Sequence, residues 1–184
     1  MKLDFEEMIQ DALNLNASRA AIIDVADIKF SNELRQMCKQ NMCGSYKSNW
    51  MCPPAIGPLS ELKEKVLKYK QGLVIQTIHP LEDSFDIEGM EEAQKLHRKI
   101  FKNILDSIKE KYKFDNVLPL SAGACDICSE CGYVHGKDCY FPEKAISSVE
   151  AYGINAMALV TSCGFPYNNG QNTVSYVGLI LFDI

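Results

Sequence analysis

Residues 124–142 read ACDICSECGYVHGKDCYFP and hold four of the chain's eight cysteines. Cys125, Cys128 and Cys131 follow one another with two residues between each pair, and Cys139 comes after seven more residues. A tight loop with this spacing turns three thiolates toward one point, and a fourth cysteine from the next turn closes the site. We therefore predict that residues 124–142 form a loop that binds a 4Fe-4S cluster.

The same spacing resembles the bacterial ferredoxin run C-x2-C-x2-C-x3-C-P, although the last gap is longer here and Pro142 does not directly follow the fourth cysteine. Zinc is the alternative, because paired Cys-x2-Cys hooks also hold a tetrahedral ion. Zinc ribbons usually separate two such hooks by a longer arm, whereas here the third cysteine continues the same period. The pattern favours an iron–sulfur cluster over zinc, and both over a group of buried thiols.

A second group of cysteines lies in residues 38–54, CKQNMCGSYKSNWMCPP. Cys38, Cys43 and Cys52 are accompanied by glycine, serine, asparagine and proline, which are typical of a loop. Loops supply cluster ligands readily, because their backbone N–H groups are free to donate hydrogen bonds to sulfur. Cys52 precedes a proline, as does a cysteine that ligates the other cluster in two-cluster ferredoxins, so the two loops can share ligands.

Length, composition and charge restrict the protein class. The chain has 184 residues and is expected to form one domain, residues 1–184, with a substantial core. Hydrophobic residues make up 47% and charged residues 23%, which is ordinary for a globular protein. Because the net charge is −5, the chain offers no basic field for a phosphate backbone, and we expect no nucleic-acid partner.

The first residues, MKLDFEEMIQDALNL, carry acidic side chains where a signal peptide needs an apolar segment behind basic residues. No window of the sequence reaches the length of a membrane span, so we expect no membrane association. These features predict a cytoplasmic protein. In a reducing compartment eight cysteines point to metal ligands rather than disulfides, and exposed clusters indicate an anaerobic host.

The remaining sequence predicts an α/β fold, with α+β as the alternative: a single mixed β-sheet covered by helices, with the two cysteine loops meeting at one end. Strands are expected at residues 19–25, 73–78, 117–120 and 173–182. Helices are expected after the capping residues Asp4 and Ser31, from Pro58 to near Gly72, over residues 87–112, from Pro142 to Gly153, and over residues 154–160 before Gly164.

The helix predicted at residues 87–112 is amphipathic. Its apolar residues keep to one stripe, so its lysines, its acids and Arg98 are expected to face water. His97 lies beside the stripe and is interpreted as a surface or core histidine rather than a ligand. Glu150, which follows the second cysteine loop, is expected to form a salt bridge or a cap.

Taken together, the motifs resemble a family of anaerobe proteins, from bacteria and archaea, that are described as predicted metal-binding proteins. The residues that carry the resemblance are Cys43, Tyr46, Asn49, Trp50 and Cys52-Pro53-Pro54 in the first loop, then Gly123-Ala124-Cys125, Cys128, Cys131, Cys139, Pro142 and the run SVEAYGI at 148–154. The resemblance spans most of the chain. It implies a metal site but no particular reaction.

Two functions fit these features. The first is an iron–sulfur protein with one or two 4Fe-4S clusters that transfers electrons to a redox partner or to a methyl- or corrinoid-metabolising enzyme. The second is an enzyme in which an open cluster iron binds a small molecule, and a zinc-stabilised interaction module is a further alternative. The first two functions differ in the role of Cys163. As a fourth ligand beside Cys38, Cys43 and Cys52, it would close the second site. Without Cys163, one iron is open or is held by another ligand such as His135.

Overall fold

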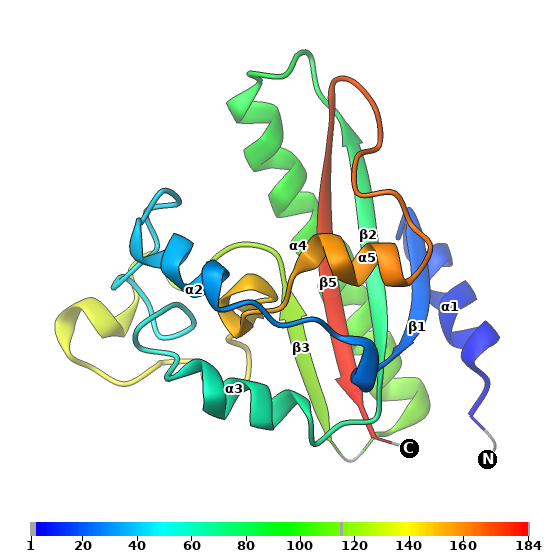
Figure 1. The fold of residues 1–184 in the computed structure, drawn as a ribbon, viewed down its shortest axis with the longest axis horizontal. Helices are drawn as coiled ribbons and strands as arrows, with labels where there is room; N and C mark the ends of the chain where they lie inside the picture. Colours follow the sequence, from blue (N-terminus) through cyan, green and yellow to red (C-terminus); the bar gives the residue numbers. More distant parts are fainter. Residues whose placement is uncertain (1–2, 115, 184) are drawn as a thin grey trace.

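The computed structural model of the protein describes residues 3–114 and 116–183. A five-stranded sheet with the order β1-β2-β5-β3-β4 forms its centre, and helices cover both faces (Figure 1). The strands are β1 (Arg19–Asp24), β2 (Gln71–Pro80), β3 (Val117–Ser121), β4 (Ser147–Ser148) and β5 (Thr173–Phe182). The α-helices are α1 (Phe5–Asn14), α2 (Asn32–Lys39), α3 (Leu59–Val66), α4 (Ile87–Tyr112) and α5 (Ala156–Ser162), and the 3₁₀-helices are η1 (Val25–Asp27), η2 (Gly132–His135) and η3 (Glu150–Tyr152).

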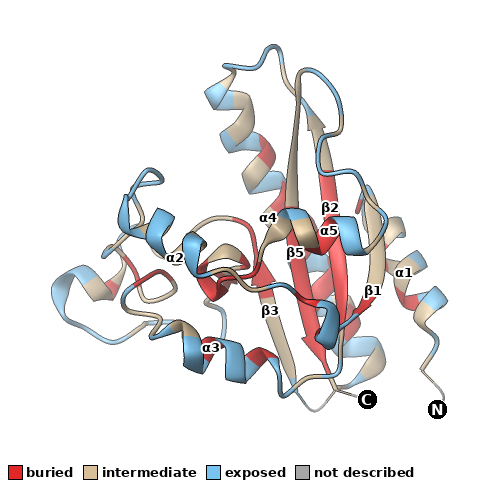
Figure 2. Ribbon diagram, viewed as in Figure 1, coloured by how far each residue is buried: buried red, intermediate tan, exposed pale blue. Residues whose placement is uncertain are grey.

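The sheet is mixed, as predicted. β2 pairs antiparallel with β1 and with β5, β5 pairs antiparallel with β3, and only the short β4 runs parallel to its neighbour β3. β2 and β5 pair along their whole lengths, from Gln71 opposite Phe182 to Pro80 opposite Thr173. Most of β2 and the last half of β5 are buried in the middle of the molecule (Figure 2). The α/β fold with a single mixed sheet is confirmed.

Each strand of the centre contributes to two separate cores, because successive side chains of a strand point to opposite faces. Leu73 and Ile75 of β2 pack with α1 and α4, whereas Val74 between them packs with α3 and α5. In β5, Leu179 packs with α3 and α5, and Ile180 packs with α1 and α4. The protein therefore has three layers, with α1 and α4 on one face of the sheet and α3 and α5 on the other.

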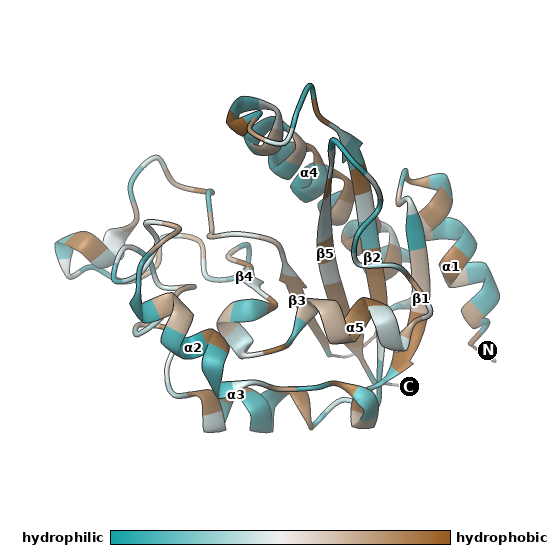
Figure 3. Cartoon of the chain, turned by 45° about the horizontal axis from the view of Figure 1, so that its top comes forward, coloured by the Kyte–Doolittle hydropathy of each residue, from teal (hydrophilic) through white to brown (hydrophobic). Residues whose placement is uncertain are grey.

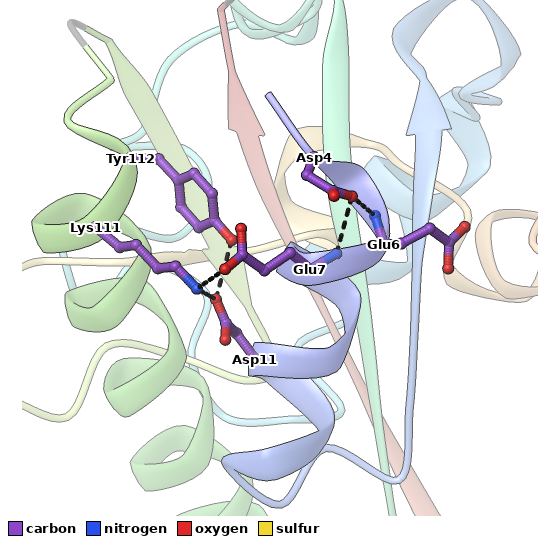
Figure 4. A network of polar contacts seen from close by, with 6 residues as sticks. All are labelled: Asp4, Glu6, Glu7, Asp11, Lys111 and Tyr112. Atoms are coloured by element: carbon purple, nitrogen blue, oxygen red, sulfur yellow. Dashed lines mark hydrogen bonds and ion pairs between the residues drawn. The ribbon is translucent and has the colours of Figure 1, made fainter. Parts of the chain in front are cut away.

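Polar contacts join the two helices of the α1 and α4 layer (Figure 4). The Lys111 ammonium group lies 2.5 Å from Asp11 and 3.0 Å from Glu7, and the Tyr112 hydroxyl donates to Asp11 over 2.9 Å. Asp4 caps α1 by accepting from the N–H groups of Glu6 and Glu7, as predicted. These contacts fix the position of the last turn of α4 against α1.

Several predicted elements are confirmed. α4 has the predicted bounds, Ser31 caps α2 by accepting from the N–H of Glu33, and Asn155 caps α5, which ends before Gly164. The four predicted strands are all present, and β2 is longer than expected. Among the helices of the described ranges 3–114 and 116–183, none combines the length and the apolar character that a membrane crossing needs.

One predicted helix ends early, and another is absent. The helix after Pro58 is present as α3 but ends at Val66, and Gly72, near its predicted end, belongs to β2, which begins at Gln71. Residues 142–153 hold a turn, β4 and η3 in place of one helix. Leu120 and Ser121 of β3 pair with β4, and the Ser147 hydroxyl donates to the main-chain oxygen of Met51 over 2.7 Å. Sheet pairing and a contact with the first cysteine loop thus override the local helical pattern.

Candidate metal centre

The four cysteines of the second loop surround one small space. A cavity of about 20 Å³ is lined by Cys125, Cys128, Cys131 and Cys139. Trp50 and Met51 of the first loop and the apolar side chains of Ile127, Phe141 and Ala145 complete its lining. The four cysteines predicted from their spacing to act together thus line the same cavity, and their role as metal ligands stays a prediction.

The backbone of the second loop turns back tightly to produce this convergence. η2 follows Cys131 directly, and the N–H of Lys137 donates to the main-chain oxygen of Gly132 over 2.9 Å. A Cβ atom at Gly132 would lie 2.6 Å from the main-chain oxygen of Asp138, so only glycine permits this approach. The reversal brings Cys139 back beside Cys131.

The Cys128 thiol is influenced by its neighbours. Burial raises the pKa of Cys128, and the neighbouring thiols Cys125, Cys131 and Cys139 raise it further. A bound cationic metal would act in the opposite direction on Cys128, because a metal binds the thiolate and removes the proton. His135, which the sequence placed in this loop, is exposed and lies 2.8 Å from Glu130.

The three cysteines of the first loop line a second, much larger cavity. Its volume is about 540 Å³, and Cys38, Cys43 and Cys52 share it with Cys125 of the second loop. Its polar lining includes Gln94 and Arg98 of α4, Ser148 of β4, Glu150 of η3 and Tyr176 of β5. The irregular cysteine loops lie beside α2 and β4 (Figure 3).

Arg35 holds the segment that carries Cys38. Its guanidinium donates to the main-chain oxygens of Ala151, over 2.8 Å, and Gly57, over 2.5 Å, and so joins α2 to η3 and to the start of α3. Burial raises the pKa of Cys38, the Cys43 thiol raises it further, and the Arg35 charge opposes both. Burial also raises the pKa of Cys52, with smaller upward contributions from Cys43, Cys38 and Cys125.

The two cysteine loops touch each other, as predicted. The Trp50 indole donates to the main-chain oxygen of Lys137 over 2.9 Å, and its ring meets Tyr133 edge-on with 5.1 Å between centroids. Cys125 lines both the small and the large cavity. The loops meet beside β4, at the edge of the sheet.

Cys163 lies apart from the other seven cysteines. It caps the C-terminal end of α5 and packs, half-buried, against the core that α3 and α5 share. Burial raises its pKa to about 11. It lines neither cysteine cavity, so the structure does not bring it to Cys38, Cys43 and Cys52.

Arg98 and Gln94 of the large cavity were not predicted as site residues. Arg98 was expected to face water, which is wrong, since its side chain is only 21% exposed. It donates to the main-chain oxygen of Ala122 over 3.2 Å and to Gln94 over 3.1 Å, and it forms an ion pair with Asp126. The sequence feature that could have revealed this contact is the spacing of Gln94 and Arg98, which places the two side chains next to each other on α4. His97, which was interpreted as a surface or core histidine, is a core residue.

The donor set fits a thiolate-bound centre. In the described part of the chain, no three or more His, Cys, Asp or Glu side chains are arranged to hold a single metal ion. The small cavity offers four thiols and an apolar lining, and the large cavity offers three thiols and Cys125. Such soft ligands suit zinc or an iron–sulfur cluster rather than calcium or magnesium.

The fold and the gathered cysteines define an α/β protein of the metal-binding class. The chain belongs to the family described as predicted metal-binding protein (DUF2284), whose model matches residues 21–182. This match confirms the resemblance that the motifs gave. No curated protein sequence matches the chain.

Solved structures with a similar chain course are those of epoxyqueuosine reductase. The enzyme from Bacillus subtilis shares 12% identity, with a TM-score of 0.46, over 97% of this chain and 45% of that chain. A selenomethionine-labelled epoxyqueuosine reductase shares 13% identity, with a TM-score of 0.48, over the same fractions. A third, bound to a modified tRNA-Tyr stem loop, shares 11% identity with a TM-score of 0.40, over 95% of this chain and 44% of that chain. The chain thus spans less than half the length of these proteins.

Proposed function

We propose that the protein is a redox enzyme with two 4Fe-4S clusters, of which the second loop holds a closed one and the first loop an open one that binds a small molecule. The observation that carries the proposal is the difference between two adjoining cavities. Four cysteines enclose about 20 Å³, whereas the three cysteines of the first loop face about 540 Å³. A closed site suits electron transfer, and an open site has room for a ligand.

Cys125, Cys128, Cys131 and Cys139 would hold the closed cluster. When bound, this group supplies one-electron chemistry to the site. The protein's part is to keep water away, which Trp50 and the apolar lining do, and to hold the loop in position through the Trp50 and Lys137 contact. A redox protein would supply the electrons, and we expect it to do so in the cytoplasm of an anaerobe.

Cys38, Cys43 and Cys52 would hold the open cluster, which leaves one coordination position to a molecule in the large cavity. Gln94, Arg98 and Tyr176 are the chain's own groups for orienting that molecule. Burial raises the pKa of the Glu150 carboxyl, so this group retains a proton to a higher pH than an ordinary glutamate.

The position of Cys163 distinguishes this enzyme from a closed two-cluster electron carrier. A carrier needs Cys163 as the fourth ligand of the first loop, and Cys163 instead packs against the core on α5. This position of Cys163 supports the open site.

The test is metal analysis and electron paramagnetic resonance of protein purified without oxygen. We expect a brown protein that contains iron and acid-labile sulfide in equal amounts, enough for two clusters. Cys163→Ser should keep both, and added cyanide should change the signal of one reduced cluster only. Loss of one cluster in Cys163→Ser would support the closed carrier, and a colourless protein with stoichiometric zinc would end the cluster proposal.

A further inference from the structure

A third hollow lies between α4, β3 and the start of the second cysteine loop, and it is lined by Cys125 but by none of Cys38, Cys43 and Cys52. Its volume is about 480 Å³, within the range of roughly 300–1,000 Å³ that small-molecule sites occupy. It shares Arg98 and residues 122–126 with the large cysteine cavity, so these residues form a common wall. We call this third hollow the α4 pocket.

The floor of the α4 pocket is apolar. Its exposed apolar surface comes from Pro119 of β3, from Ile127 and from Ile146, because Phe101 and Leu105 of α4, which also line it, are only 1% and 4% exposed. Burying an apolar group against such a floor is favourable, at about 25 cal/mol for each Å² removed from water. The pocket therefore suits a ligand with an apolar body.

One buried polar group in this floor has no partner. Ser121 lines the pocket and is 6% exposed, and within the described residues its Oγ atom forms no hydrogen bond. Ser147, buried to a similar degree on the neighbouring strand, does bond, to the oxygen of Met51. Because buried hydroxyls are nearly always satisfied, a ligand atom that reaches the Ser121 side chain from the pocket would supply the missing partner of its Oγ atom.

The rim of the pocket carries more cations than acids, in a chain whose net charge is −5. The cations are Arg98, Lys102, Lys109 and Lys144, and the acids are Asp106, Asp126 and Glu143. Arg98 pairs with Asp126, and Lys102 lies 2.6 Å from Asp106. Lys109 forms no ion pair in residues 3–114 and 116–183, so its charge faces the pocket mouth uncompensated.

We propose that the α4 pocket binds a small molecule that has an apolar body and one anionic group, a carboxylate, sulfonate or phosphate. The apolar body lies on Pro119 and Ile146, the Ser121 hydroxyl bonds a polar atom of the ligand, and Lys109 attracts its charge. This inference does not rest on the proposed enzyme function, because none of these contacts is made by a cysteine, although Cys125 lines the pocket wall.

The test is isothermal titration calorimetry of the anaerobically purified protein with 8-anilinonaphthalene-1-sulfonate, an apolar body with one anionic group. The neutral N-phenyl-1-naphthylamine has the same apolar body without the sulfonate and serves as the comparison ligand. We expect saturable binding of the sulfonate at one site and weaker binding of the neutral compound. Absence of saturable sulfonate binding, or equal binding of both compounds, would overturn the proposal.

Three variants locate the site. Lys109→Glu, on the surface of α4, should weaken sulfonate binding by about fivefold or more, and Ser121→Ala should weaken it by about fivefold through the lost hydrogen bond. Lys65→Glu makes the same charge change on α3, on the opposite face of the sheet, and should leave the affinity within about twofold. If Lys65→Glu and Lys109→Glu weaken binding equally, or if Ser121→Ala and Lys109→Glu both bind like the wild type, the α4 pocket is not the site.

Discussion

Trp50 donates its indole N–H to the main-chain oxygen of Lys137, 2.9 Å away and 87 residues later in the chain, and so joins the two cysteine loops. The same ring packs edge-on against Tyr133 and lines the cavity that the four cysteines of the second loop enclose. One side chain of the first loop thus supports the four-cysteine cavity of the second. The two loops are therefore expected to lose their order together.

Trp50→Phe should lower the free energy of unfolding by about 1 kcal/mol, because it keeps an aromatic ring and removes one hydrogen bond between the loops. Urea unfolding of the anaerobically purified protein measures this. Tyr133→Phe is the matched control, since the Tyr133 hydroxyl forms no hydrogen bond in the described structure. Equal losses in the two variants would show that ring packing alone holds the loops together.

The fold could be predicted from the sequence where one local pattern decides an element. Residues 87–112 repeat apolar side chains over many turns, and the structure gives α4 the same bounds. The run 142–153 also carries helical signals, but the Ser147 bond to Met51 and the pairing with β3 decide its conformation. Such contacts join distant segments, so no local pattern could reveal them.

The candidate site was predictable to the extent that its residues are neighbours in sequence. The spacing of Cys125, Cys128 and Cys131 identified a loop that the structure closes around one space. Arg98 was misread because an arginine on the polar side of a helix usually faces water, and only the fold brings residues 122–126 against it. The ligand role of Cys163 stays a prediction that the geometry does not favour.

Cys125→Ser should disturb both metal sites, because Cys125 lines the small and the large cavity alike. Cys128→Ser is the control, since Cys128 lines the small cavity and not the large one. Electron paramagnetic resonance of the reduced proteins should show both signals changed in the first variant and one in the second. If the two variants give the same spectrum, Cys125 serves only the second loop.

Gly123→Ala should destabilise the protein more than Gly136→Ala. Both glycines have positive φ values, +77° and +64°, and alanine at such a position costs about 1 kcal/mol. A Cβ atom at Gly123 would also lie 2.6 Å from Arg98 Nη2 and 2.7 Å from Gln94 Nε2, whereas nothing lies within 4 Å of one at Gly136. Arg98 would have to move and weaken its contacts with Ala122 and Asp126. Equal urea midpoints for the two variants would contradict this role of Arg98.

His97 should make the protein less stable in mild acid. Its side chain is fully buried, its Nδ1 lies 2.9 Å from the Thr77 hydroxyl, and burial lowers its pKa to about 3, with further lowering by the charges of His79 and Arg98. The unfolded chain binds a proton near the ordinary pKa of 6.5, and the native protein does not. Stability is therefore lost as the pH falls from 6.5 toward 3, at up to about 1.4 kcal/mol per pH unit.

His97→Leu removes this contribution and leaves the bond between Thr77 and His79 in place. Urea unfolding at about pH 7.5 and about pH 5.5 should show the wild type losing about 1 kcal/mol more than the variant between the two conditions. Ile100→Val, on the same helix, is the control, because deleting a buried methyl group costs about 1 kcal/mol at either pH. Its pH dependence should match that of the wild type. An unchanged pH dependence in His97→Leu would mean that His97 takes up its proton without unfolding.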